Sequence, residues 1–327
     1  MTTQTSPELS ELLAAARRPP QRPASAVIGL RAKLFGRPWL RGLVPVAVAV
    51  RRAEARGRRA WERQPERRTQ ALATMEAVLA GTARAGELES LARRHVIEAE
   101  VCETMFWRPW RGSSMDAASD ERLRAALADE RGVLISTAHL QPFIFVMGHV
   151  VERGGMPFSV SAPWLFAKPE PGEWAQRLDR WWQGIIARKR ERLVYSVGSF
   201  PVLRALLEQG ETVYLFYDMP GSRETQFLGK PVMLASGSAR LAFETGAPIL
   251  PTRTWREGSR FHTEVGEPLE PHDFASVEEL HDALAALHER WILLTPEALE
   301  DPRRLGAWEQ GATATGWTRP QSRSAAS

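Results

Sequence analysis

The chain has 327 residues, of which 25% are charged and 43% hydrophobic, and it contains a single cysteine, Cys102. This length supports one elaborated domain or two small ones. One thiol excludes a disulfide framework and any cysteine-based zinc or iron–sulfur site. No apolar run approaches the ~20 residues that a membrane-spanning helix needs. The first residues lack the basic and apolar parts of a signal peptide, so we expect a cytoplasmic protein.

Positive charge is concentrated at the start of the chain. Residues 1–70 contain 15 arginines and lysines against five acidic residues, whereas the remainder contains 28 against 34. Residues 1–24, polar and rich in Pro and Arg, predict a flexible lead. Residues 25–64 mix cationic and apolar side chains with Trp39, which is typical of a basic amphipathic segment at an anionic membrane surface. Packing of a basic helical hairpin is an alternative, and nucleic-acid binding is a weaker one because no nucleic-acid module is present.

The rest of the chain predicts two kinds of structure. Apolar residues spaced three to four apart predict helices over 65–130, and from Gly132 short β-branched runs alternate with helical stretches. This alternation is typical of an α/β fold with a mostly parallel central sheet flanked by helices, here preceded by an N-terminal helical region. The domain should span 65–300, with 301–327 a flexible tail. We expect strands over 133–138, 158–162, 193–197, 212–217 and 248–254, an antiparallel edge strand over 261–265, and helices over 142–152, 174–188, 200–208, 236–245 and 277–294.

His139 is the strongest candidate for chemistry. It directly follows the strand over 133–138, and ligands of such sheets bind beyond the carboxyl ends of the strands. A polar loop starting at Asp218 follows the strand over 212–217 and should reach the same edge, although a plain hairpin would also explain its turn residues. No metal constellation is present, and neither a Walker A loop nor a G-x-G-x-x-G follows a strand. A serine hydrolase is excluded because the chain has no G-x-S-x-G elbow.

The order of these motifs resembles the late lipid A biosynthesis acyltransferases. These belong to the lysophospholipid acyltransferase superfamily, which also includes mycobacterial mannoside acyltransferases. The resemblance rests on His139, on Tyr-Asp at 217–218, on Phe-Leu-Gly-Lys-Pro-Val at 227–232 and on the run 235–251, and it extends over roughly residues 60–295. It implies an acyltransferase of lipid biosynthesis without a cofactor. The acyl group would pass from acyl-CoA or an acyl-carrier protein to a hydroxyl or amine of a lipid or glycolipid. The enzyme would lie on the inner face of the cell membrane.

The resemblance also implies roles for individual residues. His139 matches the histidine of the family's HxxxxD/E pair, which takes the acceptor's proton as a general base. Asp218 matches an acidic residue that helps to shape the acceptor pocket. Arg223 and Arg240 are candidates for holding a phosphate or the donor. The last two candidates, which occupy the place of a Phe-Phe-Gly that lines the acyl groove, are Phe227 and Gly229.

One position departs from the family pattern, because the fifth residue after His139 is Ile144 instead of an acid. Three explanations are open. Asp218 or Glu152 supplies the carboxylate from another position. A more nucleophilic acceptor, such as a soluble amine of specialised metabolism, needs less help from a base. In the third explanation, the protein is a catalytically inactive, lipid-binding homologue.

Overall fold

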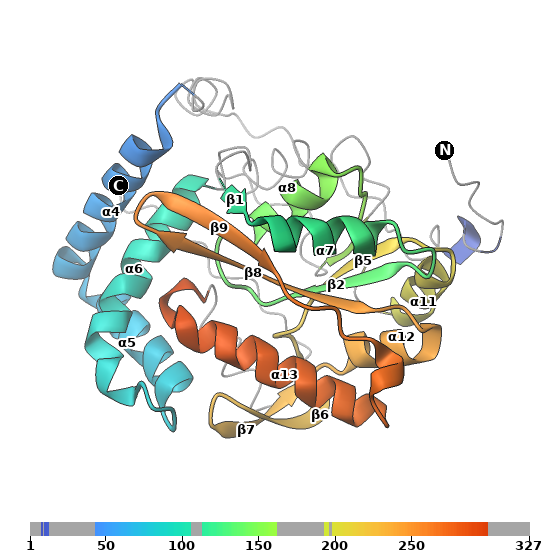
Figure 1. The fold of residues 1–327 in the computed structure, drawn as a ribbon. Coiled ribbons are helices and arrows are strands. Elements are labelled where there is room, and N and C mark those ends of the chain that lie inside the picture. Colours follow the sequence, from blue (N-terminus) through green and yellow to red (C-terminus); the bar gives the residue numbers. More distant parts are fainter. Residues whose placement is uncertain are drawn as a thin grey trace.

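The computed structural model describes residues 8, 10–12, 43–105, 113–161, 193–195 and 198–299. Within these ranges the chain forms an α/β domain with a cluster of N-terminal helices at one end (Figure 1). Most of the expected lead over 1–24, the helix expected over 174–188 and the tail expected over 301–327 lie outside the described residues. No helix in the described part of the chain is both long and apolar enough to cross a membrane.

The described residues form a seven-stranded sheet with the order β1-β9-β8-β2-β5-β3-β4. Every neighbouring pair is parallel except β8 with β9, which confirms the predicted mostly parallel α/β sheet. Two expectations were wrong. The strand expected at the edge lies inside it, because β1 pairs with β9, and β1 itself falls in the segment expected to be helical. The strands are β1 (Ser113–Met115), β2 (Val133–Thr137), β3 (Phe158–Ser161), β4 (Leu193–Tyr195), β5 (Thr212–Phe216), β8 (Ile249–Glu257) and β9 (Arg260–Val265).

Strand β2 lies in the middle of this sheet, between β5 and β8. All five of its residues are buried, as expected of a strand covered on both faces. Val133 and Ile135 belong to one hydrophobic core, whereas Leu134 belongs to the other, which follows from the two-residue period of a strand. A residue that follows β2 therefore starts at the centre of the carboxyl edge of the sheet.

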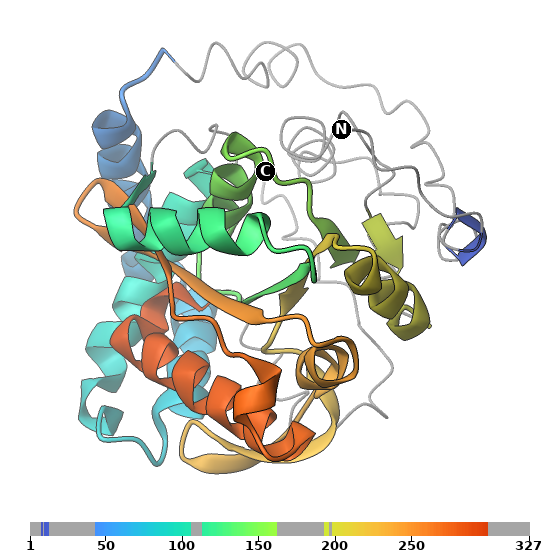
Figure 2. The same ribbon diagram turned by 45° about the vertical axis from the view of Figure 1, so that its right-hand side comes forward.

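Helices cover both faces of the sheet (Figure 2). Leu123 of α7 and Val146 of α8 share a core with Val133, whereas Leu206 of α11 and Leu284 of α13 share the other core with Leu134. Ser276 caps α13 by accepting the backbone N–H of Glu279 at 3.2 Å, which satisfies one of the helix's unpaired donors. The helices are α7 (Ala117–Leu127), α8 (Ile144–Glu152), α11 (Phe200–Glu208), α12 (Gly237–Thr245) and α13 (Val277–Leu294).

Three N-terminal helices pack against the end of the sheet: α4 (Val46–Arg63), α5 (Pro65–Leu79) and α6 (Leu88–Met105). Gly57 lets α4 approach α6 closely, since a Cβ there would lie 2.6 Å from the Cα of Ile97. The buried Glu100 accepts hydrogen bonds from Arg56 at 3.2 Å and Arg67 at 2.9 Å, which ties α4, α5 and α6 together. From residue 43, the segment expected to lie near the membrane is thus a packed helix with one exposed face.

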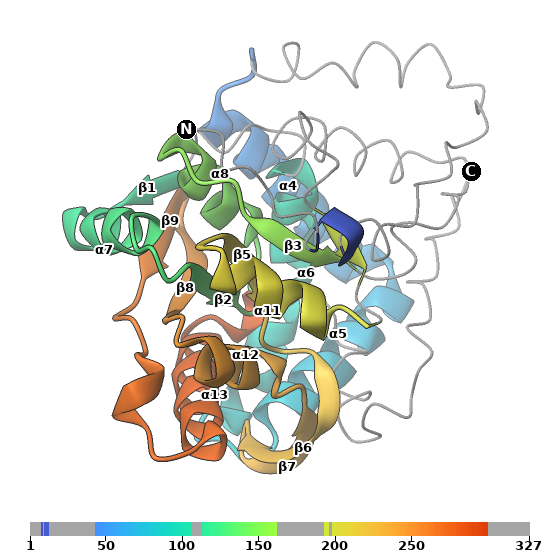
Figure 3. The ribbon, with the colours of Figure 1, turned by 90° about the vertical axis from the view of Figure 1, so that its right-hand side faces the viewer.

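The loop expected after β5 is a β-hairpin, which is the plain alternative that the sequence left open. Its strands are β6 (Pro220–Phe227) and β7 (Lys230–Leu234), and it lies beside α13 (Figure 3). Leu228 and Gly229 form the turn with φ of 56° and 74°, as a two-residue type I′ turn requires. A Cβ on Gly229 would lie 2.7 Å from the carbonyl oxygen of Gly81, so the turn is seated against the loop that follows α5.

Candidate active site

The register of the sheet brings two polar residues together. Thr137 of β2 pairs with Phe216 of β5 in parallel. Two residues further along each strand, His139 and Asp218 lie side by side at the carboxyl edge. Both side chains are buried, with 5% of His139 and 1% of Asp218 exposed.

The Asp218 carboxylate holds His139 at two points. The Oδ1 atom lies 2.6 Å from the imidazole Nδ1, and Oδ2 accepts the backbone N–H of His139 at 3.0 Å. Because a carboxylate oxygen is an acceptor, the neutral imidazole carries its hydrogen on Nδ1 and its lone pair on Nε2. This is the tautomer that a histidine needs in order to take a proton through Nε2.

Two aromatic rings fix the plane of the imidazole. Phe216 is stacked on the His139 ring, with 3.7 Å between centroids and 14° between planes. Phe143 meets the same ring edge-on at 5.4 Å and 79°, and it also contacts Phe216 edge-on at 4.9 Å. Such apolar surroundings lower the local dielectric constant, so the attraction between a protonated His139 and Asp218 is stronger here than in water.

Behind the pair, helix α13 places two buried histidines, which the sequence analysis missed. His288 Nε2 lies 3.0 Å from the Ser136 hydroxyl of β2, and its ring stacks on Tyr217 at 5.0 Å. His281 Nε2 lies 2.8 Å from the Thr225 hydroxyl. Burial lowers the pKa of each histidine to about 4, so both are neutral near pH 7. Their seven-residue spacing puts them on one face of α13 among buried leucines, which was the available signal.

The structure identifies the acid that contacts His139. Ile144 is the first residue of α8, and Asp218 supplies the carboxylate beside the imidazole from another strand. Glu152, the other candidate, is the last residue of α8, and its carboxylate lies 3.8 Å from Nδ1 of a different histidine, His149.

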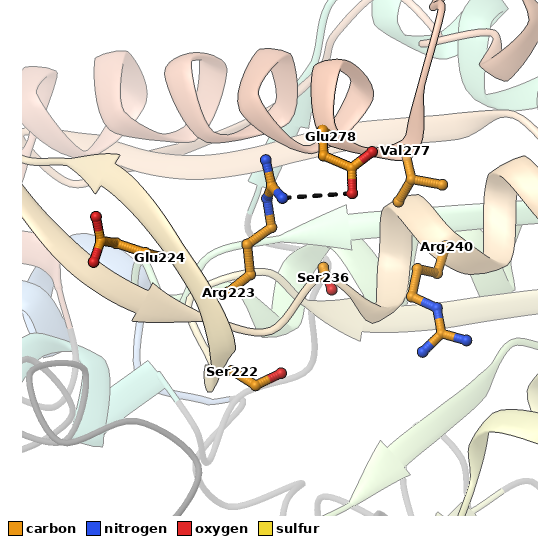
Figure 4. Close-up of a pocket in the computed structure, with 7 residues that line it drawn as sticks. All are labelled: Ser222, Arg223, Glu224, Ser236, Arg240, Val277 and Glu278. Carbon is orange, nitrogen blue, oxygen red and sulfur yellow. Dashed lines mark ion pairs between the residues drawn. The ribbon is translucent and has the colours of Figure 1, made fainter.

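An open recess of about 540 Å³ lies between β6 and the starts of α12 and α13 (Figure 4). The backbone N–H of Ala235 donates to the carbonyl of Met219 at 2.9 Å, so the start of α12 is fixed to the residue after Asp218. The recess contains both arginines that the sequence analysis selected, together with two acids, and is lined by Ser222, Arg223, Glu224, Ser236, Arg240, Val277 and Glu278.

The two arginines of the recess point in different directions. Arg223 extends towards α13 and forms ion pairs with Glu278 at 3.5 Å and Asp282 at 3.6 Å. Arg240 extends from α12 over the ring of Phe200, 4.6 Å from its centroid. The ion pairs of Arg223 are long and both acids are exposed, so they are weak and a bound anion can compete with them.

The other two residues selected from the sequence lie elsewhere. Phe227 is 0% exposed and packs in the core, where its ring is 6.0 Å from that of Tyr217. Gly229 lies in the β6–β7 turn against Gly81. Neither residue lines the recess. Within the described ranges, no group of three His, Cys, Asp or Glu side chains is arranged to hold a metal ion.

A mostly parallel α/β sheet binds its ligands beyond the carboxyl ends of the strands, and the buried His139–Asp218 pair lies at that edge. The sequence places the chain more closely. It belongs to the bacterial lipid A biosynthesis acyltransferase family, whose model matches residues 36–299. The predicted resemblance is confirmed, and the chain is a member of a family of acyltransferases.

Individual relatives are more distant. Phosphatidylinositol mannoside acyltransferase of Mycobacterium tuberculosis, found in two strains, is 32% identical over 112 residues, which cover 31% of this chain. The match spans 35% of the relative's own length. Among solved structures, the crystal structure of the 1-acyl-sn-glycerophosphate (LPA) acyltransferase PlsC from Thermotoga maritima is 16% identical, with a TM-score of 0.39. That match covers 62% of this chain and 80% of the other.

Proposed function

We propose that this protein transfers an acyl group from an acyl thioester to a hydroxyl or amine of a lipid or glycolipid at the membrane surface. The observation that carries the proposal is the contact of 2.6 Å between His139 Nδ1 and Asp218 Oδ1 at the carboxyl edge of the sheet. Family membership supports the reaction class. The donor is acyl-CoA or an acyl-carrier protein, and the reaction itself uses no cofactor.

In the proposed mechanism, His139 is the general base. Its Nε2 takes the proton of the acceptor's hydroxyl or amine as that atom attacks the thioester carbonyl. The tetrahedral intermediate collapses, the carbon–sulfur bond breaks, and the thiol leaves with the proton returned by the imidazolium. Asp218 keeps Nε2 available before the attack and stabilises the imidazolium afterwards.

The recess between β6 and the starts of α12 and α13 is the proposed site for a polar part of a substrate. A phosphate or a sugar would find hydrogen-bond donors there in Arg240 and in the serines at 222 and 236. Arg223 would add further donors once it leaves its ion pairs with Glu278 and Asp282. We propose that the enzyme acts as a peripheral protein on the inner face of the cell membrane. The hydrogen bond between the Asp218 carboxylate and His139 favours an active enzyme over an inactive lipid-binding homologue.

Release of free thiol from acyl-CoA in the presence of a total-lipid extract tests this function. His139→Ala should lower acceptor-dependent release by about 10²- to 10⁴-fold, the usual contribution of a general base. His272→Ala is the matched control, since His272 has an exposed side chain on the turn before α13. Equal release by His139→Ala and the wild type would contradict the proposal. Release with small amines alone would redirect it to a soluble acceptor.

A further inference from the structure

Helix α4 has two distinct faces. Its inner face is made of small and apolar residues that pack against the domain, among them Ala53, Gly57 and Trp61. The opposite face is exposed and strongly cationic. The helical period brings to this outward face the exposed residues Val48, Arg51, Arg52, Arg58, Arg59, Glu62 and Arg63, so five cations there outnumber one acid.

Within the part of the chain that the structure describes, most of these outward arginines form no ion pair, with Glu62 of the same face or with any other acid. Among the described residues, none of the ion pairs includes Arg51, Arg52, Arg59 or Arg63. Arg56 of the same helix, in contrast, forms an ion pair with Glu100 of α6. Like charges gathered on one helix face repel one another. An extended anionic partner would remove this repulsion. A single exposed arginine would not indicate such a partner, but a cluster on one helix face does.

The face also has an apolar end. Leu43 is 71% exposed just before α4, and Val48 is 37% exposed in its first turn. A nucleic acid would satisfy the arginines without burying Leu43. An anionic phospholipid surface satisfies both, because cations lie among the headgroups while apolar side chains enter the acyl boundary.

The position of α4 links this face to the candidate active site. Glu54 of α4 accepts a hydrogen bond from Arg256 at 2.8 Å, near the carboxyl end of β8. His139 follows the carboxyl end of β2, which pairs with β8 in parallel. The helix and the pair therefore lie at the same end of the sheet.

We infer that the outward face of α4 is the membrane-docking surface of this protein, with anionic phospholipid headgroups on its arginines and with Leu43 and Val48 inserted at its start. The inference concerns the surface on which the proposed acyl transfer would take place. Membrane docking is measured by vesicle binding and acyl transfer by thiol release. A failure of the docking inference can therefore be distinguished from a failure of the proposed function.

The test is sedimentation of the full chain with phosphatidylcholine vesicles that contain or lack phosphatidylglycerol. Two neutralised arginines, in Arg52→Gln/Arg59→Gln, should weaken partitioning to the anionic vesicles by roughly 30-fold. The matched control is Arg124→Gln/Arg290→Gln, which removes two exposed arginines from α7 and α13 and should leave partitioning unchanged. Leu43→Asn/Val48→Asn should weaken binding by roughly tenfold in both kinds of vesicle.

Equal binding of anionic vesicles by the wild type and Arg52→Gln/Arg59→Gln would overturn the inference. An equal loss in the control pair would also overturn it, because net charge and not this face would then decide binding. Unchanged vesicle binding, combined with weaker binding of an acidic acyl-carrier protein by Arg52→Gln/Arg59→Gln, would assign the face to a protein partner instead. Circular dichroism of each variant at pH 7 confirms that the helices are intact.

Discussion

The imidazole of His139 is fixed from three directions. The carboxylate of Asp218 binds its Nδ1 and its backbone N–H, Phe216 covers its face, and Phe143 meets its edge. A side chain held in this way loses little further entropy when it takes part in a reaction, which is the basis of preorganised catalysis. The proposed role of His139 follows from this fixed orientation together with its position at the sheet edge.

The recess allows a prediction about a single arginine. Arg240→Gln should raise the KM for a phosphate-bearing substrate several-fold and leave kcat close to the wild-type value, because in the proposed binding mode Arg240 contacts a part of the substrate that does not react. Steady-state kinetics with the acceptor varied measures both constants. Arg204→Gln is the control, since Arg204 on α11 also pairs with Glu244 but does not line the recess. A fall in kcat with an unchanged KM would place Arg240 elsewhere in the mechanism.

Helix α13 contacts the chain at both strands of the site, through His288. His288 reaches Ser136 three residues before His139, and its ring stacks on Tyr217, the residue before Asp218. Burial lowers the pKa of His288 to about 4, although the negative charge of Asp218 opposes the shift. Burial also lowers the pKa of His281 to about 4, and the positive charge of Arg223 adds to that effect.

These pKa values predict a loss of stability in acid. An unfolded histidine has a pKa of about 6.5, so between pH 6.5 and 4 the unfolded chain binds protons that the folded protein does not. Each buried neutral histidine therefore makes its full contribution to the free energy of unfolding above pH 6.5. This contribution, on the order of 3 kcal/mol per histidine, is lost as the pH falls towards 4.

Urea unfolding at several pH values between 7 and 5 measures this dependence. His288→Gln should reduce the slope of unfolding free energy against pH by an amount equivalent to at most about one bound proton, because it removes one of the histidines whose pKa burial lowers. His272→Gln should keep the wild-type slope, since that histidine is exposed. Identical slopes for His288→Gln and the wild type would show that this buried histidine is not the titrating group.

The sequence predicted the regular elements well because their signals are local. Helices α11 and α13 begin and end at the residues predicted for them, 200–208 and 277–294, because the apolar spacing is clear in both segments. Strand β1 was missed because it has only three residues and no apolar pattern of its own. Its place in the sheet depends on pairing with β9, a contact between segments almost 150 residues apart.

The site was predictable only in part for the same reason. The positions of His139 and Asp218 after two strands indicated a common edge, but their contact depends on β2 and β5 being neighbours in parallel register. Sequence order does not determine which strands are adjacent. Because Ile144 stands where the family has an acid, the sequence alone left both Asp218 and Glu152 as candidates for the carboxylate beside His139. In the structure, Asp218 is the acid in contact with the imidazole.

In the whole molecule, the parts proposed to act on a lipid lie at one end. The helices α4, α5 and α6 pack at the end of the sheet where β2 and β5 finish, and Arg256 connects α4 and α6 to β8 through Glu54 and Glu98. The basic segment predicted as a separate unit over 25–64 is, from residue 43, packed against this domain. A membrane under α4 would thus lie close to the carboxyl edge of the sheet.

The central claim is that His139 and Asp218 act as one unit in acyl transfer. A double-mutant cycle in the thiol-release assay tests it most directly, comparing His139→Ala, Asp218→Asn and the double variant with the wild type. We predict that Asp218→Asn alone lowers the rate by at least about 10²-fold, and that the double variant is no slower than His139→Ala alone. Full activity of Asp218→Asn, or losses that multiply in the double variant, would contradict the account.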